Sequence, residues 1–155
     1  MHGREAQSLG VDGERALWQQ TLANANKTLV QTLDIIKQND PNALVVIMAD
    51  HGGFVGMEYT LQTYTKTQDR DLIYSIFSSN LSIHWPQGDI PSYDINFKSA
   101  VNVFRILVSY LTQDTSYLDH LQDDSSYVIL NKDAPSGVYK YIDTDGTIVF
   151  EPVAQ

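Results

Sequence analysis

Cysteine is absent from the 155-residue chain. This absence excludes disulfide bonds, thiolate zinc sites and cysteine nucleophiles within these residues. It leaves the compartment open, because a lack of cysteine is compatible with reducing and with oxidising surroundings.

Basic residues are scarce as well: 10 Lys and Arg stand against 19 Asp and Glu, which gives a formal charge of -9. The basic residues are scattered singly, whereas nucleic-acid binding needs clustered positive charge. We therefore expect no nucleic-acid partner. The acidic balance would also repel an anionic ester at long range, so such a substrate would depend on a bound metal to reverse the local field.

No window approaches the roughly 20 apolar residues needed to cross a bilayer, so we predict no membrane span in this chain. Hydrophobic residues make up 43% and charged residues 19%, as is typical of a globular protein. We predict a single domain over residues 1–155, with a lead-in at 1–11, an α/β core at 12–112 and a β-rich tail at 113–155. The start Met1–Arg4 lacks the apolar core of a secretory signal, so any targeting segment would lie upstream.

The most informative segment is the apolar run from Ala43 to Ala49, which ends in Asp50-His51-Gly52-Gly53. Seven apolar residues bounded by turn residues are typical of a strand buried on both faces, as in mostly parallel sheets. Ligand sites of such sheets form at the carboxyl ends of the strands, where Asp50 and His51 would lie. A carboxylate beside an imidazole supplies two ligands for a divalent cation, and glycines allow close approach of the backbone.

The remaining pattern predicts an α/β layered fold. A helix of about 24 residues is expected from Asp12, its N-cap, to just before Asn39. Its apolar stripe would cover one face of the sheet, and it consists of Trp18, Leu22, Ala25, Leu29, Leu33 and Ile36. Residues 72–78 are expected to form a strand and residues 79–94 an irregular segment. A second amphipathic helix would carry Val101 to Leu111 and begin near Asn96 or Ser99.

The C-terminal third contains three short β-prone runs, at 127–130, 138–142 and 147–150, separated by turn residues. They predict a small antiparallel meander. The turn Asp143–Gly146 is loosely similar to a calcium loop but lacks the spaced acidic positions and terminal Glu of an EF-hand, so we interpret it as a tight hairpin turn.

Three segments together carry a resemblance to a known family. They are the strand and loop Val46–Gly52, the preceding helix with its Gln19-Gln20 and Leu33–Ile36, and the later segment Val101–Arg105. In order and spacing they resemble the sulfatase-like branch of the alkaline phosphatase superfamily, which includes the lipoteichoic acid synthases. The likeness covers roughly residues 14–112. It implies a partial alkaline-phosphatase-like layered fold, with a mostly parallel sheet flanked by helices, in the C-terminal part of a larger catalytic domain.

The resemblance also implies roles. Asp50 and His51 would coordinate the catalytic metal, and their donor atoms suit zinc or manganese, with magnesium as an alternative. The family's Thr, Ser or modified Cys nucleophile lies N-terminal to the Asp-His-Gly motif, so we expect it upstream of this chain, together with the remaining ligands. Ala49 stands where relatives often have Ser or Thr. By the same resemblance we expect an extracytoplasmic domain of a bacterial membrane protein.

Other candidate residues are weaker. His84 follows a possible strand, so we consider it for substrate binding at the same crevice, against an ordinary loop histidine. His120 forms a second Asp-His pair with Asp119 but lacks a preceding strand and a following glycine. Arg105 matches a family position, although its helical setting favours a structural ion pair over anion binding.

These features predict the C-terminal part of a metal-dependent phosphoric or sulfuric ester hydrolase or transferase, inactive by itself. Its partners would be the N-terminal part of the catalytic domain and an anionic ester substrate. One alternative is a noncatalytic binding or scaffolding domain in which Asp50-His51 is a relic. Another is a small independent metallohydrolase that uses His84 or His120 as an extra ligand.

Overall fold

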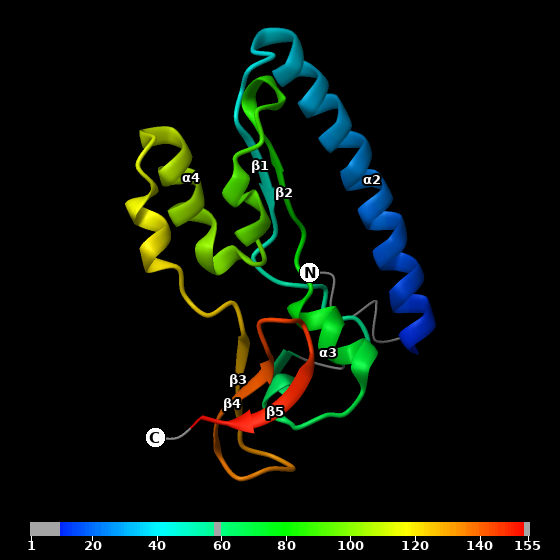
Figure 1. Cartoon of the computed structure of the whole chain (residues 1–155). Coiled ribbons are helices and arrows are strands. Elements are labelled where there is room, and N and C mark those ends of the chain that lie inside the picture. Colours follow the sequence, from blue (N-terminus) through cyan, green and yellow to red (C-terminus); the bar gives the residue numbers. More distant parts are fainter. Residues whose placement is uncertain (1–9, 58–59, 154–155) are drawn as a thin grey trace. The chain divides into compact units, whose positions relative to one another are not determined.

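The computed structural model describes residues 10–57 and 60–153. The chain divides into two compact units: one comprises Met1–Gln62 and Thr67–Gly88, and the other Thr63–Lys66 and Asp89–Gln155. Both mix helices with small sheets, as expected for a chain of mixed α and β structure (Figure 1). The predicted boundary at residue 112 does not coincide with the division between the units, and the single domain stays a prediction.

The first unit begins with the long helix α2, Gly10–Asn39. The helix therefore starts before Asp12, which is not its N-cap, and most of the predicted lead-in lies outside the described residues. None of its residues is buried. Trp18 and Leu22, from the predicted apolar stripe, are 41% and 53% exposed. Within the described residues, α2 thus lacks the close cover that its apolar stripe predicted.

Two short strands follow α2 in the first unit, β1 (Val45–Met48) and β2 (Leu81–His84). They pair antiparallel, with Val45 opposite His84 and Met48 opposite Leu81. The strand predicted from the apolar run is confirmed, but it is shorter and only half-buried, with Met48 exposed. The mostly parallel sheet is not seen, since both sheets in the described residues are antiparallel. An apolar run indicates burial but not the direction of the neighbouring strand.

Residues 72–78 do not form the predicted strand; most of them belong to helix α3, Arg70–Phe77. Asp69 caps this helix, because its carboxylate accepts a hydrogen bond of 3.1 Å from the backbone N–H of Leu72. Ile73 and Ile76 are buried on one helical face. A short run of apolar residues fits a strand and a helix alike, and here the capping aspartate in front of it was the signal for the helix. The strand β2 lies in the segment predicted to be irregular.

The second unit contains the second predicted helix, α4 (Val103–Thr112), entered through the short 3-10 helix η4 (Ala100–Asn102). Ser99, one of the two predicted starting residues, is the N-cap of η4, because its hydroxyl accepts from the backbone N–H of Val101 at 3.1 Å. The N-cap of α4 itself is Asn102, whose side chain makes no capping bond. Four further 3-10 helices complete the helical structure of the described residues: Thr60–Tyr64, Pro86–Gly88, Ser92–Asn96 and Thr115–His120.

The predicted antiparallel meander is confirmed in the second unit. It consists of β3 (Ser126–Leu130), β4 (Gly137–Ile142) and β5 (Ile148–Pro152), paired antiparallel in that order (Figure 1). The tight turn after β4 is also confirmed, because Asp143 accepts hydrogen bonds from the backbone N–H groups of Asp145 and Thr147 at 2.9 and 2.8 Å. Gly146 supplies the left-handed conformation of this turn, with φ of 82°.

Across residues 10–57 and 60–153, none of the helices combines the length and the apolar character that a membrane span requires.

Candidate metal-binding loop

Asp50 and His51 lie in the loop that follows β1, at its carboxyl end. Their side chains are 89% and 57% exposed, and His51 Nε2 lies 3.7 Å from Asp50 Oδ2. The two side chains therefore face each other at the surface instead of packing separately into the interior. This geometry leaves both donor atoms accessible to an ion from solvent.

A hydrogen bond to the backbone orients the His51 ring. Its Nδ1 lies 2.6 Å from the carbonyl oxygen of Gly52. A carbonyl oxygen can only accept, so Nδ1 carries the proton and donates it. Metal-binding histidines characteristically donate one ring N–H to a carbonyl or carboxylate, which turns the other nitrogen toward the metal. In His51 that other nitrogen is Nε2, the atom that faces Asp50.

The spacing of the two donor atoms fits a shared cation. Ligand atoms about 2.0–2.1 Å from a tetrahedral ion lie about 3.4 Å apart, close to the 3.7 Å observed between Asp50 Oδ2 and His51 Nε2. A carboxylate oxygen and a nitrogen lone pair repel each other unless a metal ion or a proton lies between them. No group of three or more His, Asp or Glu side chains arranged for a metal occurs among the described residues. Asp50 and His51 thus offer two donor atoms, fewer than a closed metal site needs.

Gly52 and Gly53 connect this loop to helix α3. Their backbone N–H groups donate to the carbonyl oxygens of Ile76 and Ser75 at 2.8 and 2.7 Å. These carbonyls belong to the last turn of α3, whose oxygens lack partners within the helix. A Cβ atom at Gly52 would collide with the Ser75 carbonyl oxygen. The glycines therefore allow close approach of the backbone, as predicted, and the approaching partner in this unit is α3.

Helix α2 fixes the same loop from another direction. The Trp18 indole N–H donates to the carbonyl oxygen of Gly53 at 3.1 Å, and the Glu14 carboxylate accepts from the backbone N–H of Gly56 at 2.9 Å. A Cβ atom at Gly53 would lie 2.9 Å from the Trp18 ring. We did not predict these positioning contacts, which join residues 35 and 42 positions apart in the chain. No local pattern indicates contacts over such separations.

Phe54 is a further neighbour that the sequence did not indicate. Its ring packs edge-on against the His51 ring, with 5.0 Å between the centroids. Its backbone has φ of 54°, in the left-handed region that residues other than glycine rarely adopt. The surrounding loop contacts hold this conformation and so place an aromatic ring beside the imidazole.

His84 does not join Asp50 and His51. It lies at the end of β2 opposite Val45, at the far end of the two-stranded ladder from Met48. Since a strand rises about 3.4 Å per residue, the ladder alone places His84 about 10 Å from the end where Asp50 follows. The antiparallel pairing is the reason: the carboxyl ends of β1 and β2 point in opposite directions. His84 is therefore not at the same crevice, contrary to the expectation from a parallel sheet.

The other two candidate residues, His120 and Arg105, belong to the second unit. His120 is an exposed residue at the end of the 3-10 helix Thr115–His120. Arg105 donates from Nη1 to the carbonyl oxygen of Val101 at 3.0 Å, within its own helical segment, and the expected ion pair is not seen among residues 10–57 and 60–153. Asn102, in the same motif, is 1% exposed. Its amide bonds to the carbonyl oxygen of Gln122 and the Asp124 carboxylate, and its oxygen accepts from the backbone N–H of Gln122.

A scan against protein-family models found no match for this chain, and neither did the searches of curated proteins and of solved structures.

Proposed function

We propose that this chain is the C-terminal part of a metal-dependent phosphoric or sulfuric ester hydrolase or transferase, to which it contributes Asp50 and His51 as metal ligands. The observation that carries the proposal is the pairing of His51 Nε2 with Asp50 Oδ2 at 3.7 Å, with Nδ1 engaged by the Gly52 carbonyl. The proposal includes a family, the sulfatase-like branch of the alkaline phosphatase superfamily. This family assignment depends on the resemblance of the strand, the preceding helix and the Val101–Arg105 segment.

The residues of this chain would hold and orient the metal. Asp50 supplies a hard, charged oxygen, while His51 supplies a nitrogen whose direction is fixed by its own backbone hydrogen bond. Zinc or manganese suits these donors best, and magnesium is the alternative. When bound, such an ion activates a hydroxyl nucleophile and neutralises charge on the non-bridging oxygens of the ester. Because two neighbouring ligands leave most of the coordination sphere open, the chain alone should bind metal weakly and be inactive.

The proposal includes a partner, the N-terminal part of the same catalytic domain, which would bring the nucleophile and further ligands. The proposal also includes a fold for the complete domain. Strands of the N-terminal part would extend the β1–β2 sheet into a mostly parallel sheet flanked by helices. The exposed apolar side chains of Leu22 and Val30 on α2 and of Met48 on β1 support this arrangement, because a layered sheet would bury them. By resemblance, we place the whole protein outside the cytoplasmic membrane of a bacterium.

Metal analysis of the protein with its upstream sequence tests the proposal. Asp50→Asn and His51→Gln should each lower the metal content measured by inductively coupled plasma mass spectrometry and abolish hydrolysis of aryl phosphate, phosphodiester and sulfate ester probes. The matched control is the second Asp-His pair of the chain, altered as Asp119→Asn and His120→Gln, which should leave both readouts unchanged. Metal content that is insensitive to Asp50 and His51 would overturn the assignment.

A noncatalytic binding domain remains the alternative, and one observation favours it. The contacts of Gly52 and Gly53 with α3 and Trp18 account for both glycines without any ligand. Under this alternative the loop is a packing element and Asp50-His51 is a relic. Upstream sequence without a Thr or Ser after a buried strand, together with a specific partner for the chain alone, would support it.

A further inference from the structure

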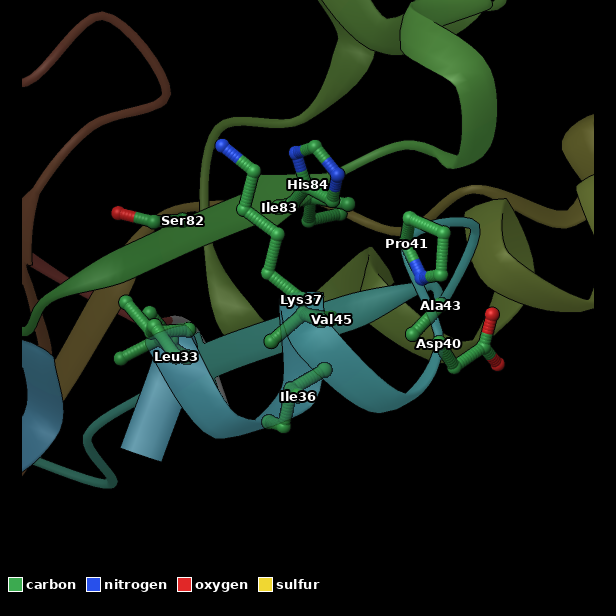
Figure 2. A pocket seen from close by; sticks show the side chains of 11 residues that line it. Leu33, Ile36, Lys37, Asp40, Pro41, Ala43, Val45, Ser82, Ile83 and His84 are labelled. Atoms are coloured by element: carbon green, nitrogen blue, oxygen red, sulfur yellow. The ribbon is translucent and has the colours of Figure 1, made fainter. Parts of the chain in front are cut away.

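A pocket with a volume of about 400 Å³ lies between the C-terminal half of α2 and the β1–β2 sheet (Figure 2). Ile83 of β2 lines the pocket, and its apolar wall further includes Leu33 and Ile36 from the helix and Val45 and Ile47 from β1. All five are only half-buried, so their apolar surface is open to an occupant. Pockets of this volume suit small organic ligands.

The sheet register divides the wall into an apolar and a polar side. Val45 is paired with His84 and Ile47 with Ser82, so these four side chains share one face of the sheet. The β1 half of that face is apolar and the β2 half is polar. An occupant that matches both halves must itself have an apolar body and a polar end.

The charged side chains of the pocket determine which polar head group an occupant should have. Lys37, in the last turn of α2, extends toward β2, where the His84 ring lies (Figure 2). Neither side chain has a hydrogen bond or ion pair within the described part of the chain. Asp40, the acidic residue of the pocket, points away from them and accepts a hydrogen bond from the backbone N–H of Asn42 at 3.1 Å. An ammonium and an imidazole N–H thus remain to receive an anion.

We propose that this pocket binds a single-chain amphiphile with a carboxylate head, as in a medium-chain fatty acid. The alkyl chain lies along Leu33, Ile36, Val45 and Ile47, and the carboxylate contacts Lys37 and His84. The end of the site that holds the carboxylate, at His84, lies at the opposite end of the β1–β2 ladder from Asp50 and His51. The inference therefore stands independently of the metal-binding proposal.

Three probes with one alkyl chain and different heads test the inference on the whole chain: decanoate, decanol and decyltrimethylammonium. Isothermal titration calorimetry should give decanoate the highest affinity, about fivefold above decanol, which is the factor that one partly exposed charge interaction supplies. Added salt should reduce the preference for decanoate. Amide shifts in NMR spectra should map binding to residues 33–47 and 81–84. Equal affinity for the three heads, shifts elsewhere, or no binding would overturn the proposal.

Substitutions in the pocket test where the carboxylate head group binds. Lys37→Gln and His84→Gln should each lower decanoate affinity toward that of decanol without changing decanol binding. The matched control is Lys27→Gln, which alters an exposed lysine of the same helix outside the pocket. Ala43→Phe, which fills the pocket from its edge, should weaken all three probes while circular dichroism stays unchanged. Self-association that decanoate leaves intact and Ala43→Phe disrupts would instead identify a second copy as the occupant and overturn the proposal.

Discussion

Gly52 illustrates how a single residue fixes the candidate metal loop. Its backbone N–H donates to the Ile76 carbonyl oxygen, and a Cβ atom there would collide with the neighbouring Ser75 carbonyl. Backbone atoms cannot move aside as a flexible side chain does. Any side chain at this position must therefore displace the loop from the end of α3.

We expect Gly52→Ala to lower the free energy of unfolding by about 1–3 kcal/mol, the usual cost of forcing extra atoms into a packed site. It should also weaken metal binding by Asp50 and His51, because the carbonyl that orients His51 belongs to Gly52. Urea denaturation measures the first effect. Gly137→Ala is the control, since its Cβ would have its nearest neighbour at 3.9 Å and should change stability little. Equal stability of the two variants would contradict the packing argument.

Asn102 plays a comparable part in the second unit. It is buried and joins the start of α4 to residues 122–124 through bonds to the Gln122 backbone and the Asp124 carboxylate. Asn102→Ala leaves these partners unsatisfied and should cost about 1–3 kcal/mol, whereas Asn24→Ala on the exposed surface of α2 should be near neutral. Thermal denaturation of both variants checks this. A neutral Asn102→Ala would show that water or other groups replace the lost bonds.

At the scale of elements, the start of the meander is held by one carboxylate. Asp123 accepts from the Ser125 hydroxyl at 2.6 Å, from the Ser125 N–H at 3.0 Å and from the Tyr127 hydroxyl at 2.8 Å. These bonds, with a smaller contribution from Lys140, lower the pKa of Asp123 from 3.8 to about 2. Tyr127 responds in the opposite sense: its bond to Asp123 raises the pKa of the phenol.

The lowered pKa of Asp123 predicts a dependence of stability on pH. The folded state favours the ionised carboxylate, so its contribution is complete above the unfolded pKa near 3.8 and is lost as the pH falls toward 2. Asp123→Asn should therefore flatten the fall in melting temperature between about pH 4 and pH 2. Asp89→Asn, at an exposed position, is the control and should keep the fall. Melting curves with identical slopes in both variants would exclude this role for Asp123.

The sequence predicts a helix or strand correctly where its hydrophobic pattern is long and has a clear period. The long helix, α4 and the three strands of the meander have persistent periods and clear turn residues, and all are present. Helix α3 was predicted as a strand because an apolar run of seven residues fits either state. The sequence pattern singled out Asp50 and His51 as candidates because a predicted strand precedes them and two glycines follow. It did not single out Phe54, Trp18 and Glu14, since only the folded chain brings them to the loop.

At the scale of the whole molecule, the exposure of α2 is unusual, because few contacts in the described residues pack against this long helix. The helix has 30 residues, none of them buried, and Leu22, Val30 and Ile35 are more than half exposed. A helix is normally stabilised in a protein by packing an apolar face, beyond what its own propensity supplies. The first unit provides such contacts at the Trp18 loop and at the pocket, which lie near the two ends of α2.

Hydrogen exchange therefore distinguishes a self-sufficient chain from part of a larger domain. In the chain alone, amides at the centre of α2 should exchange faster than those of β3 and β4, because few packed contacts oppose local opening. In the longer protein, the proposed N-terminal part would cover the apolar side of α2, and the same amides should become at least tenfold slower, a gain of about 1.4 kcal/mol in the free energy of opening. Mass spectrometry of peptides from residues 20–32 in both forms gives the comparison, with peptides from 137–152 as the internal control. If α2 exchanges equally fast in the two forms, the N-terminal part does not pack on it, and the layered fold proposed for the complete enzyme is wrong.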